Sequence, residues 1–191
     1  KNPALMAECL KIAGEGLKLY KEKVYDKAFE KFYDAAMLGY PTAMFYAGVC
    51  YHNGEGTEQD SVMAFRMFRN AANGGEITSM HNLANCYANG YGTARNDSLA
   101  VRWYRSAADS GYAKSMTMLA KCYEEGVLIE KDNKKSHAWY SRAAENKEPY
   151  ALYKLGCHQE RMDSLAGLKK RATRKSPAVE YFTLAATLKS P

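Results

Sequence analysis

Small and apolar residues recur at helical spacing along most of this chain. In residues 42–52 they stand three and four positions apart, which places them on one face of a helix; they are Met44, Ala47, Gly48 and Tyr51. Gly54-Glu55-Gly56 follows, where glycine permits the positive φ angles of a tight turn. A second stretch then has the same helical spacing, at Ala64, Phe68, Ala71 and Ala72. The pattern predicts two helices joined by a glycine turn.

This helix pair is repeated with a period of 36 residues. Ala-Ala pairs begin at Ala35, Ala71, Ala107 and Ala143, and Cys-Tyr pairs begin at Cys50, Cys86 and Cys122. Gly-x-Gly turns begin at Gly54 and Gly90 and continue at Gly126, where Leu128 replaces the second glycine; single glycines stand at Gly39, Gly75 and Gly111. Four series on one period predict a tandem array of helix pairs.

We therefore expect an all-α fold, an α/α superhelical repeat solenoid of about five helix-turn-helix units that forms a single domain over residues 1–191. The expected units are 4–40, 41–76, 77–112, 113–148 and 149–191. The first and last depart from the pattern, since residues 4–40 lack a glycine turn and Ala185-Ala186 follows Ala143-Ala144 by 42 residues. Terminal repeats are often atypical because one side of them faces solvent.

The repeat resembles the Sel-1-like repeat, a branch of the tetratricopeptide-repeat superfamily. The first clear copy carries the motif at Ala43, Gly48, Tyr51, Gly54, Gly56, Asp60, Ala64, Phe68, Ala71, Ala72 and Gly75. The resemblance covers residues 42–148 closely and most of the remainder loosely. It implies that the first helix of each unit lines a concave groove that holds a protein or peptide partner.

Carried over by position, the resemblance assigns the following residues to the groove: Phe45, Tyr46, Val49, His52, His81, Asn82, Asn85, Lys114, Thr117, Lys121 and Tyr153. Their character runs from apolar through amide and imidazole to cationic. Asn can hydrogen-bond a peptide backbone and Lys can meet carboxylates. A segment with an apolar anchor and an acidic end would be complementary, whereas the plain alternative is that these residues only face solvent.

The net charge of +6 is concentrated near the end of the chain. Residues 161–191 hold seven basic and two acidic side chains, so the preceding residues are nearly neutral. Five of the basic residues form a loop that could contact an acidic partner, acidic lipid or nucleic acid, or could simply be solvated; they are Lys169, Lys170, Arg171, Arg174 and Lys175. The neutral remainder disfavours nucleic-acid binding by the whole chain.

The cysteines and histidines indicate packing and not chemistry. Cys50, Cys86 and Cys122 take one position in successive units, where helix packing separates them by about 8–10 Å. A disulfide needs Cα atoms about 4.4–6.8 Å apart, so we expect free thiols and a cytoplasmic, reducing compartment. The four histidines form no metal-ligand spacing, and no nucleophile stands with a base. We expect no enzyme activity, no cofactor and no metal.

The predicted function is therefore a non-catalytic protein–protein interaction scaffold or adaptor. Two alternatives stay open: a regulatory module of a larger enzyme whose catalytic part lies outside these residues, and an RNA-binding helical repeat. No apolar run reaches the roughly 18 residues that a membrane span needs, and no secretory leader precedes the first helix. The chain reads as a segment of something longer. The pattern leaves the oligomeric state open.

Overall fold

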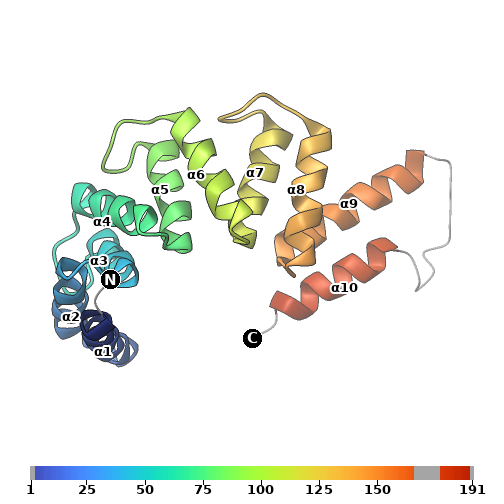
Figure 1. Cartoon of the computed structure of the whole chain (residues 1–191). Helices are drawn as coiled ribbons and strands as arrows, with labels where there is room; N and C mark the ends of the chain where they lie inside the picture. Colours follow the sequence, from blue (N-terminus) through green and yellow to red (C-terminus); the bar gives the residue numbers. More distant parts are fainter. Residues whose placement is uncertain (1–2, 166–176, 190–191) are drawn as a thin grey trace. The chain divides into compact units, whose positions relative to one another are not determined.

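The computed structural model describes residues 3–165 and 177–189, and within these ranges it contains ten helices and no strand (Figure 1). The helices are α1 (Pro3–Lys21), α2 (Tyr25–Met37), α3 (Pro41–Asn53), α4 (Ser61–Asn73), α5 (Ile77–Asn89), α6 (Asp97–Asp109), α7 (Ala113–Glu125), α8 (Asn133–Glu145), α9 (Pro149–Leu165) and α10 (Pro177–Lys189). The predicted all-α repeat fold of helix-turn-helix units is confirmed. The predicted basic loop from Lys169 to Lys175 lies outside the described residues.

A polar residue at one fixed repeat position begins the second helix in three of the pairs, at α4, α6 and α8, whereas Val24 before α2 makes no such cap. The Asp60 carboxylate accepts hydrogen bonds from the backbone N–H groups of Val62 and Met63, both at 2.9 Å. The side chains of Asn96 and Asp132, one and two periods later, accept from the first turns of α6 and α8. These caps satisfy N–H groups that have no partner within the helix, and so the repeat itself specifies where the second helices begin.

The glycine turn ends the first helix and lets neighbouring repeats approach closely. Gly54 ends α3 with φ 73°, and its N–H donates to the Cys50 carbonyl. At Gly56 a Cβ would lie 2.2 Å from the backbone oxygen of Tyr25, so only glycine allows this turn to lie against the start of α2. Leu128 takes the equivalent place in a later turn and keeps a positive φ of 67°.

The core of each helix pair is a large ring packed on a small residue. A Cβ on Gly48 of α3 would lie 2.8 Å from the ring of Phe68 in α4, and Gly16 stands in the same relation to Phe32. The Ala-Ala pairs of the second helices are mostly buried. Small residues therefore bring the helix backbones together, and the buried aromatic ring fills the remaining space.

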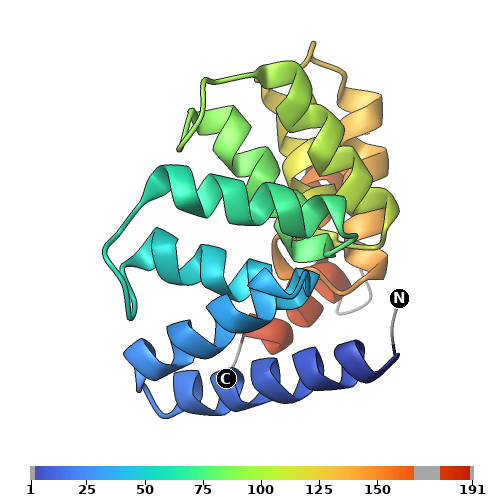
Figure 2. The same cartoon turned by 60° about the vertical axis from the view of Figure 1, so that its left-hand side comes forward.

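The contacts divide the chain into two compact parts, Lys1–Ser106 and Ala107–Pro191, which we describe separately. In the N-terminal part, helices α1 to α5 pack side by side in chain order (Figure 2). In the C-terminal part, α7 packs on α8, α8 on α9, and α9 on α10. Each part therefore contains at least one place where a helix pair meets the first helix of the next repeat.

Candidate functional site

The N-terminal part contains a cavity of about 200 Å³ between α3, α4 and α5. We call it the amide cavity. It is lined by His52, Phe68, Asn82, Asn85, Cys86, Asn89 and Tyr91. The cavity lies where the α3–α4 pair meets α5, the first helix of the next repeat. Three of its lining residues are predicted groove residues, namely His52, Asn82 and Asn85.

The inner wall of the amide cavity is apolar. Phe68 and Cys86 belong to one buried cluster, against which the half-buried Phe45 and Val49 pack. Burial raises the pKa of the Cys86 thiol to about 11, so the sulfur is neutral near physiological pH. An apolar side chain entering the cavity would therefore meet other apolar groups.

The outer wall is a row of three amides on one face of α5. Asn82, Asn85 and Asn89 stand three and four residues apart. The Tyr104 hydroxyl donates to Asn85 Oδ1, and Asn89 Nδ2 donates to the Asn85 backbone carbonyl at 3.0 Å. Because the Asn85 oxygen is occupied, its NH₂ group is left to donate elsewhere. Asn82 makes no side-chain hydrogen bond within the described residues.

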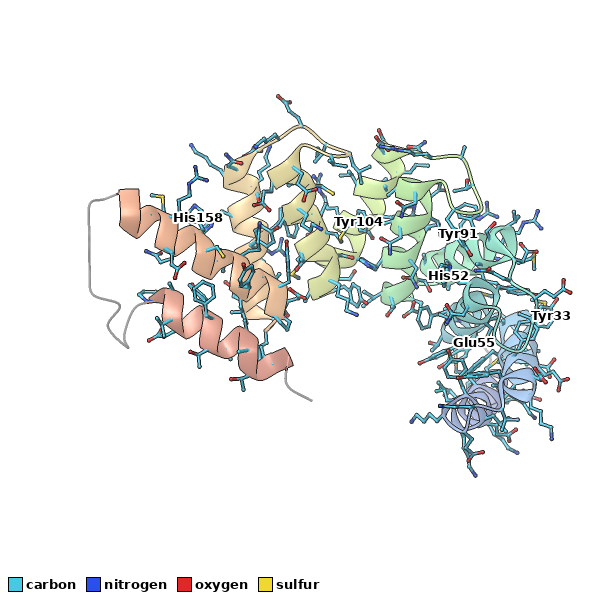
Figure 3. All side chains as sticks on the ribbon, turned by 180° about the vertical axis from the view of Figure 1, so that it is seen from behind. Tyr33, His52, Glu55, Tyr91, Tyr104 and His158 are labelled. Carbon is cyan, nitrogen blue, oxygen red and sulfur yellow. The ribbon has the colours of Figure 1, made fainter. Side chains whose placement is uncertain are left out.

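His52 and Tyr91 close one end of the cavity. Their rings meet edge to face with centroids 4.9 Å apart, and Figure 3 shows the two side chains next to each other. The Tyr91 hydroxyl is buried and has no hydrogen-bond partner within the described residues. An unpaired buried hydroxyl costs about 1–3 kcal/mol, so a ligand atom or water that bonded it would be stabilising.

The other predicted groove residues of the N-terminal part lie near the amide cavity but outside its lining. Tyr46 stacks on Phe32 with ring centroids 4.9 Å apart, and the ring of Phe45 lies 6.3 Å from that of Phe68. The His81 ring lies 5.5 Å from the ring of Tyr104. These residues and Val49 therefore pack beside the residues that line the cavity and are not part of its lining.

None of the predicted groove residues of the C-terminal part lines the cavity between α7, α8 and α9 that is described below. Lys114 is exposed, whereas Thr117 is only 8% exposed and donates a 3.2 Å hydrogen bond to Glu148. The Lys121 ammonium lies 5.9 Å from the centre of the Tyr150 ring. Tyr153 is exposed. Their assignment to a binding groove stays a prediction.

A second cavity, of about 520 Å³, lies between α7, α8 and α9, and we call it the cationic cavity. It is lined by Glu124, Lys131, Asn133, Ser136, His137, Tyr140, Lys154, Leu155, His158, Arg161 and Met162. Lys154 Nζ lies 2.8 Å from Glu124 Oε1, and the Tyr140 hydroxyl donates to Glu124 Oε2 at 2.9 Å. Burial alone would raise the pKa of Glu124, but the two hydrogen bonds, together with the positive charges of Lys154 and Lys131, lower that pKa.

The two cavities occupy the same place in the repeat. Moving two periods along the chain takes His52 to Glu124, Phe68 to Tyr140, Asn82 to Lys154, Cys86 to His158 and Asn89 to Arg161. The predicted groove residues include three that line the amide cavity, but they do not include its other lining residues, Phe68, Cys86, Asn89 and Tyr91. The 36-residue register is the signal that could have found the second cavity, once the first was known.

The remaining cysteines are mostly buried packing residues within the described part of the chain. The five cysteines are free, and four of them are buried. Burial raises the pKa of Cys50 to about 12 and that of Cys122 to about 11, which suppresses the reactive thiolate. Within residues 3–165 and 177–189, no three His, Cys, Asp or Glu side chains are grouped to hold a metal ion. No helix there is long and apolar enough to cross a membrane.

Comparison with known proteins gives a consistent picture. The family model of the Sel1 repeat matches residues 41–76, 77–112, 113–147 and 149–190. A Sel1 repeat protein from Oxalobacter formigenes is 26% identical, with a TM-score of 0.80 over 93% of this chain and 70% of that one. The uropathogenic Escherichia coli protein c5321, a protective antigen with an SLR fold, is 28% identical, with a TM-score of 0.77 over 94% of this chain. The match spans only 38% of c5321. No curated protein matches the chain.

Proposed function

Because the chain belongs to the Sel1 repeat family, we propose that it is a non-catalytic interaction module that binds a peptide segment of a partner protein. Sel1 repeats typically serve as protein-interaction scaffolds and are typically non-catalytic. The observation that carries the finer proposal is the amide cavity, because it combines an apolar inner wall with an amide outer wall at predicted groove positions. The cavity holds one apolar side chain of the bound segment.

The size of the amide cavity fits a single side chain. Its volume is about 200 Å³, below the roughly 300–1,000 Å³ of sites for drug-sized molecules. An apolar cavity of about 150 Å³ holds a benzene molecule. One aromatic or branched aliphatic side chain is therefore the occupant that this volume favours.

The amides beside the cavity suit the backbone of the same segment. The Asn85 NH₂ group can donate to a peptide carbonyl, because the hydrogen bond from Tyr104 orients the amide. Asn82 can both donate and accept. An extended peptide offers carbonyl and N–H groups at regular spacing, so a row of amides on one helix face can hold it without reading its sequence.

The test is a selection from random peptides displayed on phage, followed by affinity measurements on the enriched peptides. We expect the enriched peptides to share one aromatic or branched aliphatic residue. Asn82→Trp places an indole at the cavity and should weaken binding about tenfold or more. Asn70→Trp, on an exposed position of α4, is the matched control and should leave binding unchanged. Equal binding by the two variants, with helicity intact by circular dichroism, would contradict the proposal.

The two alternative functions predict different behaviour. A regulatory module would bind a second domain of its own protein, so the enriched peptides would match a sequence elsewhere in the full-length chain. An RNA-binding repeat would need cations and stacking rings that recur in each repeat. The amide cavity has no Lys or Arg in its lining, which favours a peptide over RNA.

A further inference from the structure

The cationic cavity carries charge that the rest of its lining does not compensate. Lys131, Lys154 and Arg161 face one carboxylate, Glu124, which leaves a net charge of +2 with both histidines neutral. Lys154 is paired with Glu124. Lys131 and Arg161 form no ion pair within the described residues. Two cations are therefore left facing a cavity that holds no other anionic group among the described side chains.

The cavity is also rich in hydrogen-bond donors that lack acceptors. Ser136 is only 5% exposed, lines the cavity, and its hydroxyl has no partner within residues 3–165 and 177–189. The one carboxylate, Glu124, already accepts from Lys154 and Tyr140. The Ser136 hydroxyl is therefore a further donor that a ligand in the cavity could use.

We propose that the cationic cavity binds a phosphate monoester. Such a group carries a charge of about −1.5 to −2 at neutral pH and three strong acceptor oxygens, which match the uncompensated +2 and the excess of donors. A carboxylate carries half of that charge. The planar Arg161 guanidinium can hold two phosphate oxygens at once. The volume of about 520 Å³ leaves room for the group that is esterified to the phosphate.

His137, one of two neighbouring histidines in the cavity, is expected to take up a proton when a dianion binds. The rings of His137 and His158 lie with centroids 4.6 Å apart, and burial, followed by the charge of His158, lowers the pKa of His137. The charged and titratable groups that share the cavity with the pair are Glu124 of α7, Lys131 of the turn, Tyr140 of α8, and Lys154 and Arg161 of α9. The cations Lys131, Lys154 and Arg161 favour a neutral His137 imidazole, whereas Glu124 and a bound dianion favour its imidazolium. The uncharged Tyr140 hydroxyl favours neither form by its charge.

The first experiment is calorimetric titration of the chain with phenyl phosphate and with phenyl sulfate, which has the same shape and a single charge. Phenyl phosphate should bind about tenfold more tightly. Arg161→Gln and Lys131→Gln should each weaken it about tenfold, because each removes a charged donor. Lys147→Gln removes the same charge from an exposed position outside the cavity and should change the affinity less than about twofold. Equal affinity for the two esters, or equal losses in Arg161→Gln and Lys147→Gln, would overturn the proposal.

Two further measurements test the role of the histidines and the source of the ligand. At about pH 7.5, titration in buffers of different ionisation enthalpy should show proton uptake that His137→Gln reduces. N-acetyl phosphoserine amide and a phosphoserine peptide of neutral sequence should both bind. Tighter binding of the peptide identifies a phosphorylated protein segment as the ligand, and equal binding identifies a small phosphate ester. If the phosphoserine amide, the phosphoserine peptide and phenyl phosphate all fail to bind, the proposal is overturned.

Discussion

The amide cavity and the cationic cavity are lined from the same positions of the repeat, two periods apart, and they differ in almost every polar group. Phe68 and Tyr140 are both buried aromatic rings in the second helix. Around them, Asn82 corresponds to Lys154 and Cys86 to His158. The positions that hold the helix pair together therefore stay alike, while the positions that face the cavity change from neutral to cationic.

The comparison shows how a repeat array can vary the side chains that line an inter-repeat cavity without altering its fold. Each repeat contacts mainly its neighbours, so a cavity between two repeats depends on few side chains. The Tyr140 hydroxyl illustrates the point, since this one atom beyond a phenyl ring allows a hydrogen bond to Glu124. Phe68 has no such atom, and the residue two periods before Glu124, His52, pairs with Tyr91 instead.

The largest expected effect tests whether the two rings have the same structural role. Phe68→Ala and Tyr140→Ala should each lower the free energy of unfolding by about 3–5 kcal/mol, because a buried ring is lost and a void remains. Denaturant unfolding followed by circular dichroism measures this. Asn70→Ala, at an exposed position, should change it by less than about 0.5 kcal/mol. If the free energy of unfolding fell by less than about 1 kcal/mol in only one of the two ring variants, the two positions would not have the same structural role.

A smaller effect is expected at the turn that follows each second helix. Gly75 adopts φ 90° in the N-terminal part, whereas Lys147, two periods later, adopts φ 58° with a side chain attached. Lys147→Gly should raise the free energy of unfolding by up to about 1 kcal/mol, since the strained backbone is relieved and only an exposed side chain is lost. Gly75→Lys should lower the free energy of unfolding by about 1–2 kcal/mol, because a side chain disfavours the positive φ angle there. A Cβ at Gly75 would meet no other atom within 4 Å, so the backbone angle is the only cost. Thermal unfolding measures both variants, and a stabilising Gly75→Lys would refute the explanation.

The smallest effect concerns the ion pair that only the cationic cavity has. The pKa of Glu124 is lowered in the folded chain, so its contribution to stability is present above the unfolded pKa near 4.3 and is lost as pH falls through the folded pKa. Lys154→Met should cost about 0.5 kcal/mol at pH 7, discounted because Lys154 and Glu124 are 25% and 37% exposed. This cost should disappear as the pH falls below the folded pKa of Glu124. Asn82→Met, at the equivalent position of the amide cavity, should show no such dependence on pH.

Much of the fold could be predicted because the repeat signals are local. The Ala and Gly series marked the helix faces and turns, and Asp60, Asn96 and Asp132 stand where the second helices begin. The replaced glycine at Leu128 was visible in the sequence, yet the backbone there keeps φ 67°. The position in the repeat therefore keeps its backbone conformation even where a leucine replaces the glycine.

The candidate sites were less predictable because cavities depend on which side chains of different helices meet. Three predicted groove residues, His52, Asn82 and Asn85, line the amide cavity. Phe68 and Cys86 also line it, although the sequence pattern indicated only a packing role for them. His137 and His158 are 21 residues apart in the sequence and match no ligand motif, and only the packing of α8 on α9 brings their rings together. Whether the predicted groove residues Lys114, Thr117, Lys121 and Tyr153 bind a partner stays a prediction.

The sequence by itself determined the period, the all-α repeat fold and the places where helices begin and end, because caps, glycine turns and apolar faces act over a few residues along one chain. The tertiary structure alone decided that one inter-repeat cavity is apolar and lined by amides while its counterpart is cationic. That difference arises from side chains on three helices, such as Glu124, Tyr140 and Lys154, whose hydrogen bonds exist only after the helices have packed. The local sequence pattern therefore specifies the repeat, and the contacts between neighbouring repeats specify the chemical character of each cavity.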